Sequence, residues 1–122
     1  MGNTVQTYFH PGPYPETDGP PQFDPMLGFP KGRKQRVMKA TEEEMIAAKV
    51  PLDLRDYCAH IYLDFVGCMR LNFPFYLPCE KYQHKYADCE FEDYVLRMKE
   101  YERERRLLVR QEKKQKALQA AA

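Results

Sequence analysis

Several features common in enzymes and membrane proteins are missing from this 122-residue sequence, which has no tryptophan. It contains no run of about eighteen apolar residues, so no segment of it should span a membrane. No Lys or Arg occurs before Lys31, and no apolar core of a secretory leader is present, so we expect no cleavable leader of either the basic or the secretory type. There is also no Ser–His–Asp, paired-carboxylate or glycine-rich phosphate pattern, so we expect a protein that is not an enzyme.

Proline is abundant but unevenly spread. Seven of the ten prolines fall in the first thirty positions: Pro11, Pro13, Pro15, Pro20, Pro21, Pro25 and Pro30. A segment of this composition cannot bury a core of its own, so residues 1–40 are predicted to form an extended arm that ends in a basic segment. The foldable part is then about eighty residues, a size at which cross-links often supplement a small core.

Charge is segregated along the chain, although the net charge is only +1. Residues 31–39 carry five basic and no acidic side chains, residues 40–96 carry eleven acidic and five basic, and residues 97–116 carry nine basic and four acidic. An acidic middle between two basic segments favours docking surfaces for other proteins and gives no indication of nucleic-acid binding.

The pattern after the arm predicts helices and no strands. Residues 41–51 should form a short helix, because Thr41 and Glu44 have capping-box spacing and Pro51 ends the segment. Asp53 is predicted to cap a second helix that begins near Leu54. After a Pro-containing turn, a third helix should start at Pro78 and continue as a charged C-terminal helix over 93–122, with a frayed end.

Four cysteines lie on two apolar stripes of these predicted helices. Nine residues separate Cys58 from Cys68, and nine separate Cys79 from Cys89. The stripes have helical spacing and consist of Cys58, Ile61, Tyr62, Phe65, Cys68 and Met69 in the first helix, and of Cys79, Tyr82, Tyr86 and Cys89 in the second.

Helix geometry limits how these cysteines can pair. Ten residues of helix rise about 15 Å, so no disulfide can form within either helix. In an antiparallel hairpin the positions of facing residues have a constant sum, and both Cys58 with Cys89 and Cys68 with Cys79 sum to 147. The spacing therefore predicts the disulfides Cys58–Cys89 and Cys68–Cys79 in a helical hairpin over 52–92, within an all-α fold.

Other uses of the cysteines are less consistent with the spacing. A structural zinc site takes tightly spaced ligand pairs, and a catalytic dithiol needs a reactive cysteine in a polar loop. We therefore expect no metal site. The single histidines His60 and His84 are interpreted as exposed or partner-facing side chains, and the carboxylates Asp56, Asp64 and Asp88 as solvated parts of helix faces.

Aromatic residues are frequent outside the predicted helices. Phe73, Phe75 and Tyr76 lie in the turn, and they could pack within the hairpin or contact a partner. For the aromatic residues of the arm, contact with a partner protein is favoured: Tyr8, Phe9, Tyr14, Phe23 and Phe29.

Twin Cys-x9-Cys motifs on a hairpin resemble the CHCH (coiled-coil-helix-coiled-coil-helix) family. Within it, the chain is similar to an accessory subunit family of mitochondrial respiratory complex I. The similar segments cover most of residues 28–108: "GFP" (Gly28–Pro30), "LRDYCAH" (Leu54–His60), "NFPFYLPC" (Asn72–Cys79), His84, Cys89 and "EDYVLRMKEYERERRLL" (Glu92–Leu108).

This resemblance implies a non-catalytic subunit without a cofactor, peripheral to the inner membrane on its intermembrane-space side, whose partners are neighbouring membrane-arm subunits. It also implies trapping by the oxidative import relay (Mia40), with Cys58 as the docking cysteine and Ile61, Tyr62 and Phe65 beside it. Gly2 is a candidate myristoylation site, although Gln6 stands where the motif has Ser or Thr. The alternative is a soluble intermembrane-space assembly factor or metallochaperone.

Overall fold

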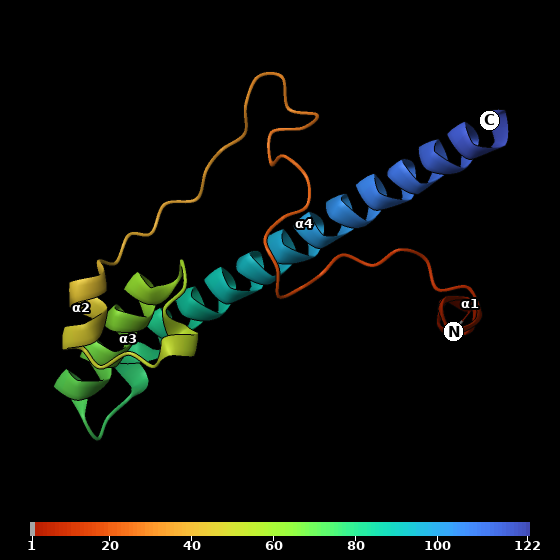
Figure 1. Cartoon of the computed structure of the whole chain (residues 1–122). Helices are drawn as coiled ribbons and strands as arrows, with labels where there is room; N and C mark the ends of the chain where they lie inside the picture. The colour runs from red at the N-terminus through yellow and green to blue at the C-terminus, as the bar shows by residue number, and fades with distance from the viewer. Residues whose placement is uncertain (1) are drawn as a thin grey trace. The chain divides into compact units, whose positions relative to one another are not determined.

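The computed structural model describes residues 2–122, and these residues form helices and irregular segments but no strand. The elements in chain order are α1 (Gly2–Phe9), α2 (Glu42–Ala47), the 3-10 turn η1 (Leu52–Leu54), α3 (Ala59–Asn72), the 3-10 turn η2 (Leu77–Cys79) and α4 (Glu80–Ala121) (Figure 1). The all-α prediction is confirmed. None of the helices within 2–122 combines the length and the apolar character that crossing a membrane requires.

The chain divides into two compact units. The first, here called the hairpin unit, is Lys34–Leu96 and contains α2, α3 and the beginning of α4. The second, here called the arm unit, combines the segment that ends at Arg33 with Arg97–Ala122. The long α4 therefore contributes its first turns to one unit and the rest to the other.

The short helix α2 begins as the sequence predicts. The Thr41 hydroxyl accepts a hydrogen bond from the Glu44 amide at 3.2 Å, and the Glu44 carboxylate accepts one from the Thr41 amide at 3.4 Å. This reciprocal pair satisfies two amides that a helix start leaves without intrahelical partners. The helix ends where Lys49 takes a left-handed conformation, with φ of 54°, and Pro51 follows.

The start of the second long helix differs from the prediction. Asp53 does not cap it, because Leu52–Leu54 forms only a 3-10 turn and α3 begins at Ala59. Arg55 breaks the helical path with φ of −84° and ψ of 64°. Its side chain donates to the Val50 carbonyl at 3.0 Å, which fastens this loop to the end of α2. Cys58 consequently lies at the N-cap of α3, one position before the helix.

Both ends of the chain are more helical than expected. Residues 2–9 precede the first proline, so no ring interrupts the backbone there, and they form α1 instead of an extended segment. At the other end α4 continues to Ala121 without the predicted fraying, and it passes through positions 92 and 93 without a break. The helix starts after η2, in which Pro78 occupies one of the first two positions.

Two disulfides join α3 and its N-cap to η2 and α4 within the hairpin unit. The outer disulfide, Cys58–Cys89, has Cα atoms 6.0 Å apart, and the inner one, Cys68–Cys79, has them 5.7 Å apart. These are the pairs given by the constant sum of positions, and both separations lie in the usual range. Figure 1 shows α3 lying beside the first turns of α4, as two cross-links at matched heights require.

The apolar core of the hairpin unit is small. Its buried apolar residues are Ala40, Met45, Val50, Cys58, Ala59 and Cys79. The cluster around Met45 packs α2 against the first turns of α3, where Tyr62 and Leu63 are partly buried. The rings of Tyr62 and Tyr86 lie 5.7 Å apart between α3 and α4. So few buried side chains give a modest hydrophobic contribution, and the disulfides must supply much of the stability.

Removing each of the two disulfides should therefore lower the free energy of unfolding by a different amount. The outer one closes a sequence separation of 31 residues and the inner one of 11. By the loop-closure relation the double substitution Cys58→Ala/Cys89→Ala should lower the free energy of unfolding by about 4 kcal/mol, and Cys68→Ala/Cys79→Ala by about 3 kcal/mol. Urea unfolding followed by circular dichroism measures both, and a larger cost for the inner pair would contradict this ranking.

Candidate functional site

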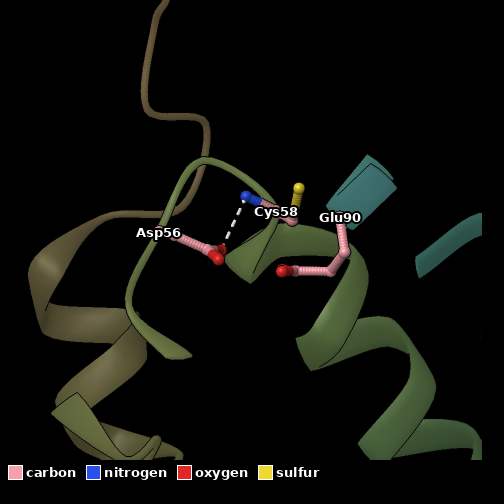
Figure 2. A group of neighbouring side chains, drawn as sticks. All are labelled: Asp56, Cys58 and Glu90. Atoms are coloured by element: carbon pink, nitrogen blue, oxygen red, sulfur yellow. Dashed lines mark hydrogen bonds between the residues drawn. The ribbon is translucent and has the colours of Figure 1, made fainter. Parts of the chain in front are cut away.

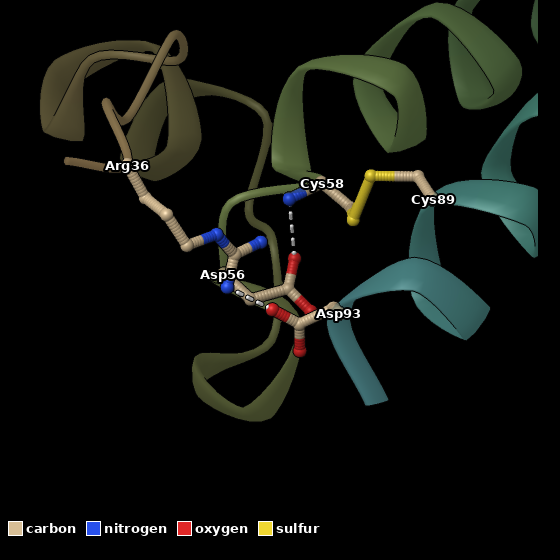
Figure 3. Close-up of a disulfide and its surroundings, with 5 residues drawn as sticks. All are labelled: Arg36, Asp56, Cys58, Cys89 and Asp93. Atoms are coloured by element: carbon tan, nitrogen blue, oxygen red, sulfur yellow. Dashed lines mark hydrogen bonds and ion pairs between the residues drawn. A yellow bond between two sulfur atoms is a disulfide. The ribbon is translucent and has the colours of Figure 1, made fainter. Parts of the chain in front are cut away.

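The outer disulfide lies in a cluster of charged side chains at the start of α3. The Asp56 carboxylate accepts a hydrogen bond from the Cys58 amide at 2.9 Å, which helps to start the helix (Figure 3). Beside it, Arg36 forms an ion pair with Asp93 of α4. Asp93 is buried, with an exposed fraction of only 6%. The Arg36 guanidinium also lies 4.0 Å from the ring centre of Tyr57. These contacts tie the segment before α2 to the cross-linked hairpin.

The carboxylate of Glu90 follows the disulfide on α4 and lies near that of Asp56 in the loop before α3. Burial, and then the neighbouring Asp56 carboxylate, raise the pKa of Glu90 above its ordinary value of 4.5. Burial and the adjacent Glu90 carboxylate also raise the pKa of Tyr86, to about 12. One oxygen of Glu90 is buried without a hydrogen-bond partner among the described residues. The fold therefore makes this carboxyl group harder to ionise than it is in water.

Three potential ligand atoms meet at this place. Those of Asp56, Cys58 and Glu90 all lie within 4.8 Å of one another (Figure 2). The sulfur of Cys58, however, is bonded to Cys89, and a metal ion binds a cysteine as its thiolate. The arrangement is thus a structural junction, and the sulfur belongs to the cross-link.

The structure places the other polar candidates as follows. Asp64 and Asp88 are exposed, as expected, but Asp56 is half-buried in the loop before α3, so its interpretation as part of an exposed helix face was wrong. His84 is exposed on α4, with its ring 3.4 Å from the Glu80 carboxylate. His60 is half-buried, and its Nδ1 has no hydrogen-bond partner among the described residues.

The predicted targeting residues are only partly described. Ile61, Tyr62 and Phe65 are half-buried in the first two turns of α3, directly after the fully buried Cys58. Gly2 is the first residue of α1. Acylation of Gly2 requires prior removal of Met1, which lies outside the described residues.

The turn between α3 and α4 exposes a row of large apolar side chains. This apolar turn comprises Leu71, Phe73, Phe75 and Leu77, which are 72% to 87% exposed. No charged residue occurs between Arg70 and Glu80. Of the two interpretations of the aromatic residues, packing inside the hairpin is therefore wrong for Phe73 and Phe75. An apolar, charge-free protrusion on a rigid support is typical of a protein–protein contact.

Part of the arm packs against the chain's own C-terminal helix. Within the arm unit, the Arg103 guanidinium donates to the carbonyl oxygens of Asp24 at 3.1 Å and Leu27 at 2.7 Å, and it lies 5.5 Å from the ring centre of Phe29. The Gln22 amide donates to Glu104 at 3.0 Å. The aromatic residues before this segment, Tyr8 and Phe9, remain exposed and contact each other.

Comparison with known proteins identifies a family. Residues 39–101 match the model of the NADH-ubiquinone oxidoreductase B18 subunit (NDUFB7) family. The chain is similar to three proteins named NADH dehydrogenase [ubiquinone] 1 beta subcomplex subunit 7. It is 51% identical to that of Mus musculus over 107 residues, which are 88% of this chain and 76% of the relative. Identity is 50% to that of Bos taurus, over 78% and 69% of the two chains, and 46% to that of Caenorhabditis elegans, over 83% of each.

The raised pKa of Glu90 predicts a pH-dependent stability. Because the folded state favours the protonated carboxyl, the folded hairpin loses stability as pH rises from about 4.5 toward neutrality. Glu90→Gln should remove this loss, so the Tm difference between the variant and the parent chain should grow in favour of the variant from pH 4.5 to pH 7. The control is Glu92→Gln, at an exposed neighbour. A difference that stays constant with pH, or the same trend in the control, would contradict this account.

Proposed function

The chain belongs to the NADH-ubiquinone oxidoreductase B18 subunit (NDUFB7) family, and from this premise we propose that it is a non-catalytic accessory subunit of mitochondrial respiratory complex I. Its role would be to help assemble and stabilise the membrane arm of that complex by binding neighbouring subunits. The observation that carries the binding role is the apolar turn, which the chain itself leaves uncovered.

The geometry of the hairpin suits the apolar turn to docking. The inner disulfide joins Cys68 to Cys79, so it closes the loop that carries the apolar turn. A side chain that is already held in place loses less conformational entropy on binding than one on a mobile loop. Phe73 and Phe75 would then act as aromatic anchors, which commonly dominate the energetics of protein interfaces.

The proposed location is the intermembrane-space face of the inner membrane, where the protein would be peripheral. Disulfides persist in oxidising compartments, and all four cysteines of the chain are paired. Import would end with oxidation by the Mia40 relay, which would act on the reduced chain at Cys58. Its apolar neighbours Ile61, Tyr62 and Phe65 lie within the next two helical turns.

Acylation of Gly2 would add a weak membrane anchor to this arrangement. One myristoyl chain gives only marginal, reversible membrane binding, so it would supplement protein contacts without replacing them. The departure at Gln6 leaves this modification a prediction.

The alternative is a soluble assembly factor or metallochaperone of the intermembrane space. A metallochaperone of this class needs additional cysteines for its metal, and the four present here are all in disulfides. We therefore favour the accessory subunit.

The docking role predicts that the apolar turn is needed for incorporation. The double variant Phe73→Ser/Phe75→Ser should fold normally, since both rings are exposed, yet its share in complex I should fall about tenfold or more, because an aromatic anchor typically contributes about 2 kcal/mol. The control Ile46→Ser/Leu52→Ser changes two exposed apolar residues elsewhere in the hairpin unit. Blue-native electrophoresis of mitochondria measures the incorporated share. Equal incorporation of both variants would refute docking through the apolar turn, and a persistent free pool of the parent chain would favour the soluble alternative.

The import role predicts that the two cysteines of the outer disulfide are not equivalent. Cys58→Ser and Cys89→Ser remove the same cross-link, but only the first removes the proposed docking cysteine. The mitochondrial level of Cys58→Ser, measured by immunoblotting after synthesis in the cytosol, should be several-fold lower than that of Cys89→Ser. Equal levels would show that Cys58 acts only through the disulfide.

A further inference from the structure

A groove of about 770 Å³ lies within the arm unit, between the arm segment around Leu27 and the C-terminal part of α4. Five of its twelve lining residues are Lys or Arg, and Glu102 is the one acidic residue among them. The apolar part of its lining comes from Phe23, Leu27, Phe29 and Leu107. The groove thus combines a strong positive charge with an apolar surface.

The charged and apolar parts are arranged along α4. The arm is fastened at Arg103, which contacts the carbonyl oxygens of Asp24 and Leu27 and lies near the Phe29 ring, so the apolar wall lies at this level. Arg110 is seven residues further along the helix, a rise of about 10 Å. Leu107 lies between the two levels, on the lining of the groove.

The cations at the far end are available to a ligand. Arg106 is paired with Glu102 at 3.1 Å. In contrast, Arg110 and Lys114 are exposed, lie one helical turn apart, and form no ion pair within residues 2–122. The nearby Glu112 carboxylate is held by Lys116 at 2.8 Å.

We propose that this groove binds one anionic phospholipid. Its phosphate would lie between Arg110 and Lys114, and an acyl chain would extend past Leu107 toward the rings of Phe23 and Phe29. Lys and Arg clusters beside apolar surface are typical of anionic-lipid recognition. A free phosphate compound would leave the rings uncovered, and in a zwitterionic lipid such as phosphatidylcholine the choline cation already offsets the charge of the phosphate. The volume lies in the range of small-ligand pockets and suits a headgroup with part of one acyl chain, whereas a docked protein segment needs a wider contact area.

This proposal concerns the arm unit and does not depend on the apolar turn. If the groove does not bind lipid, the proposed docking role of the apolar turn is unaffected. If the apolar turn does not dock, the proposal of a lipid site is unaffected. If it is correct, the chain contacts the membrane surface through a structured site in addition to any acylation of its N-terminus.

Vesicle flotation with the full-length oxidised chain tests the proposal. The chain should bind vesicles of phosphatidylcholine with phosphatidylglycerol, at roughly four parts to one, and should not bind phosphatidylcholine alone. Arg110→Gln/Lys114→Gln should weaken binding about 30-fold, because each cation near an anionic surface contributes roughly fivefold. The control Lys31→Gln/Lys113→Gln removes the same charge from exposed positions of the arm unit outside the groove and should weaken binding by about fivefold at most.

Soluble probes separate the phospholipid from other sources of negative charge. Dihexanoyl phosphatidylglycerol should displace the chain from the vesicles, while glycerol 1-phosphate should not. Leu107→Gln should lower the affinity for the short-chain lipid about tenfold, as expected for the loss of one apolar contact of leucine size. Circular dichroism of each variant should show the helix content of the parent chain.

Four results would overturn the proposal: binding to neutral vesicles, no binding to either vesicle, equal losses in the two charge variants, or displacement by glycerol 1-phosphate alone. Displacement by a polyglutamate peptide as readily as by the short-chain lipid would also overturn it, and would assign the cations to an acidic protein segment.

Discussion

Two sulfur–sulfur bonds hold α3 and its N-cap against η2 and the first turns of α4, and the hairpin unit has little else with which to fix that register. Its buried apolar residues are few, and two of the most deeply buried are themselves the cysteines Cys58 and Cys79. A core of this size gives a small margin over the conformational entropy of the chain. The cross-links compensate by restricting the unfolded state, and they also place the Asp56, Glu90 and Asp93 carboxylates at the junction (Figure 2 and Figure 3).

A hairpin stabilised by disulfides can leave its largest apolar residues on the surface. In a small domain without cross-links, side chains such as Phe73 and Phe75 would be needed in the core, whereas here they are exposed on the apolar turn. In the arm unit, which contains none of the cysteines, the basic side chains of α4 border a groove. Both surfaces are suited to contacts with other molecules, which is consistent with a structural subunit of a larger assembly.

The cysteine pairs, the capping box at Thr41 and the all-α class could be predicted because each depends on local spacing. The start of α3 could not be predicted, because it depends on Arg55 reaching back to the Val50 carbonyl and on the Asp56 carboxylate accepting a hydrogen bond from the Cys58 amide. The charged junction was also missed, because the burial of Asp93 and the partial burial of Glu90 follow from tertiary packing. The sequence "DYC" did contain a signal: an Asp can accept a hydrogen bond from the amide two residues further on, here that of the N-cap residue Cys58.

The most direct test of this account is a disulfide map of the protein isolated from mitochondria, obtained by proteolysis without reduction and mass spectrometry after blocking of free thiols. The account predicts two cross-linked peptides, one containing Cys58 with Cys89 and the other Cys68 with Cys79, and no blocked thiol. A bond between Cys58 and Cys79, or a substantial fraction of blocked cysteines, would contradict the register on which the hairpin and its docking surface depend.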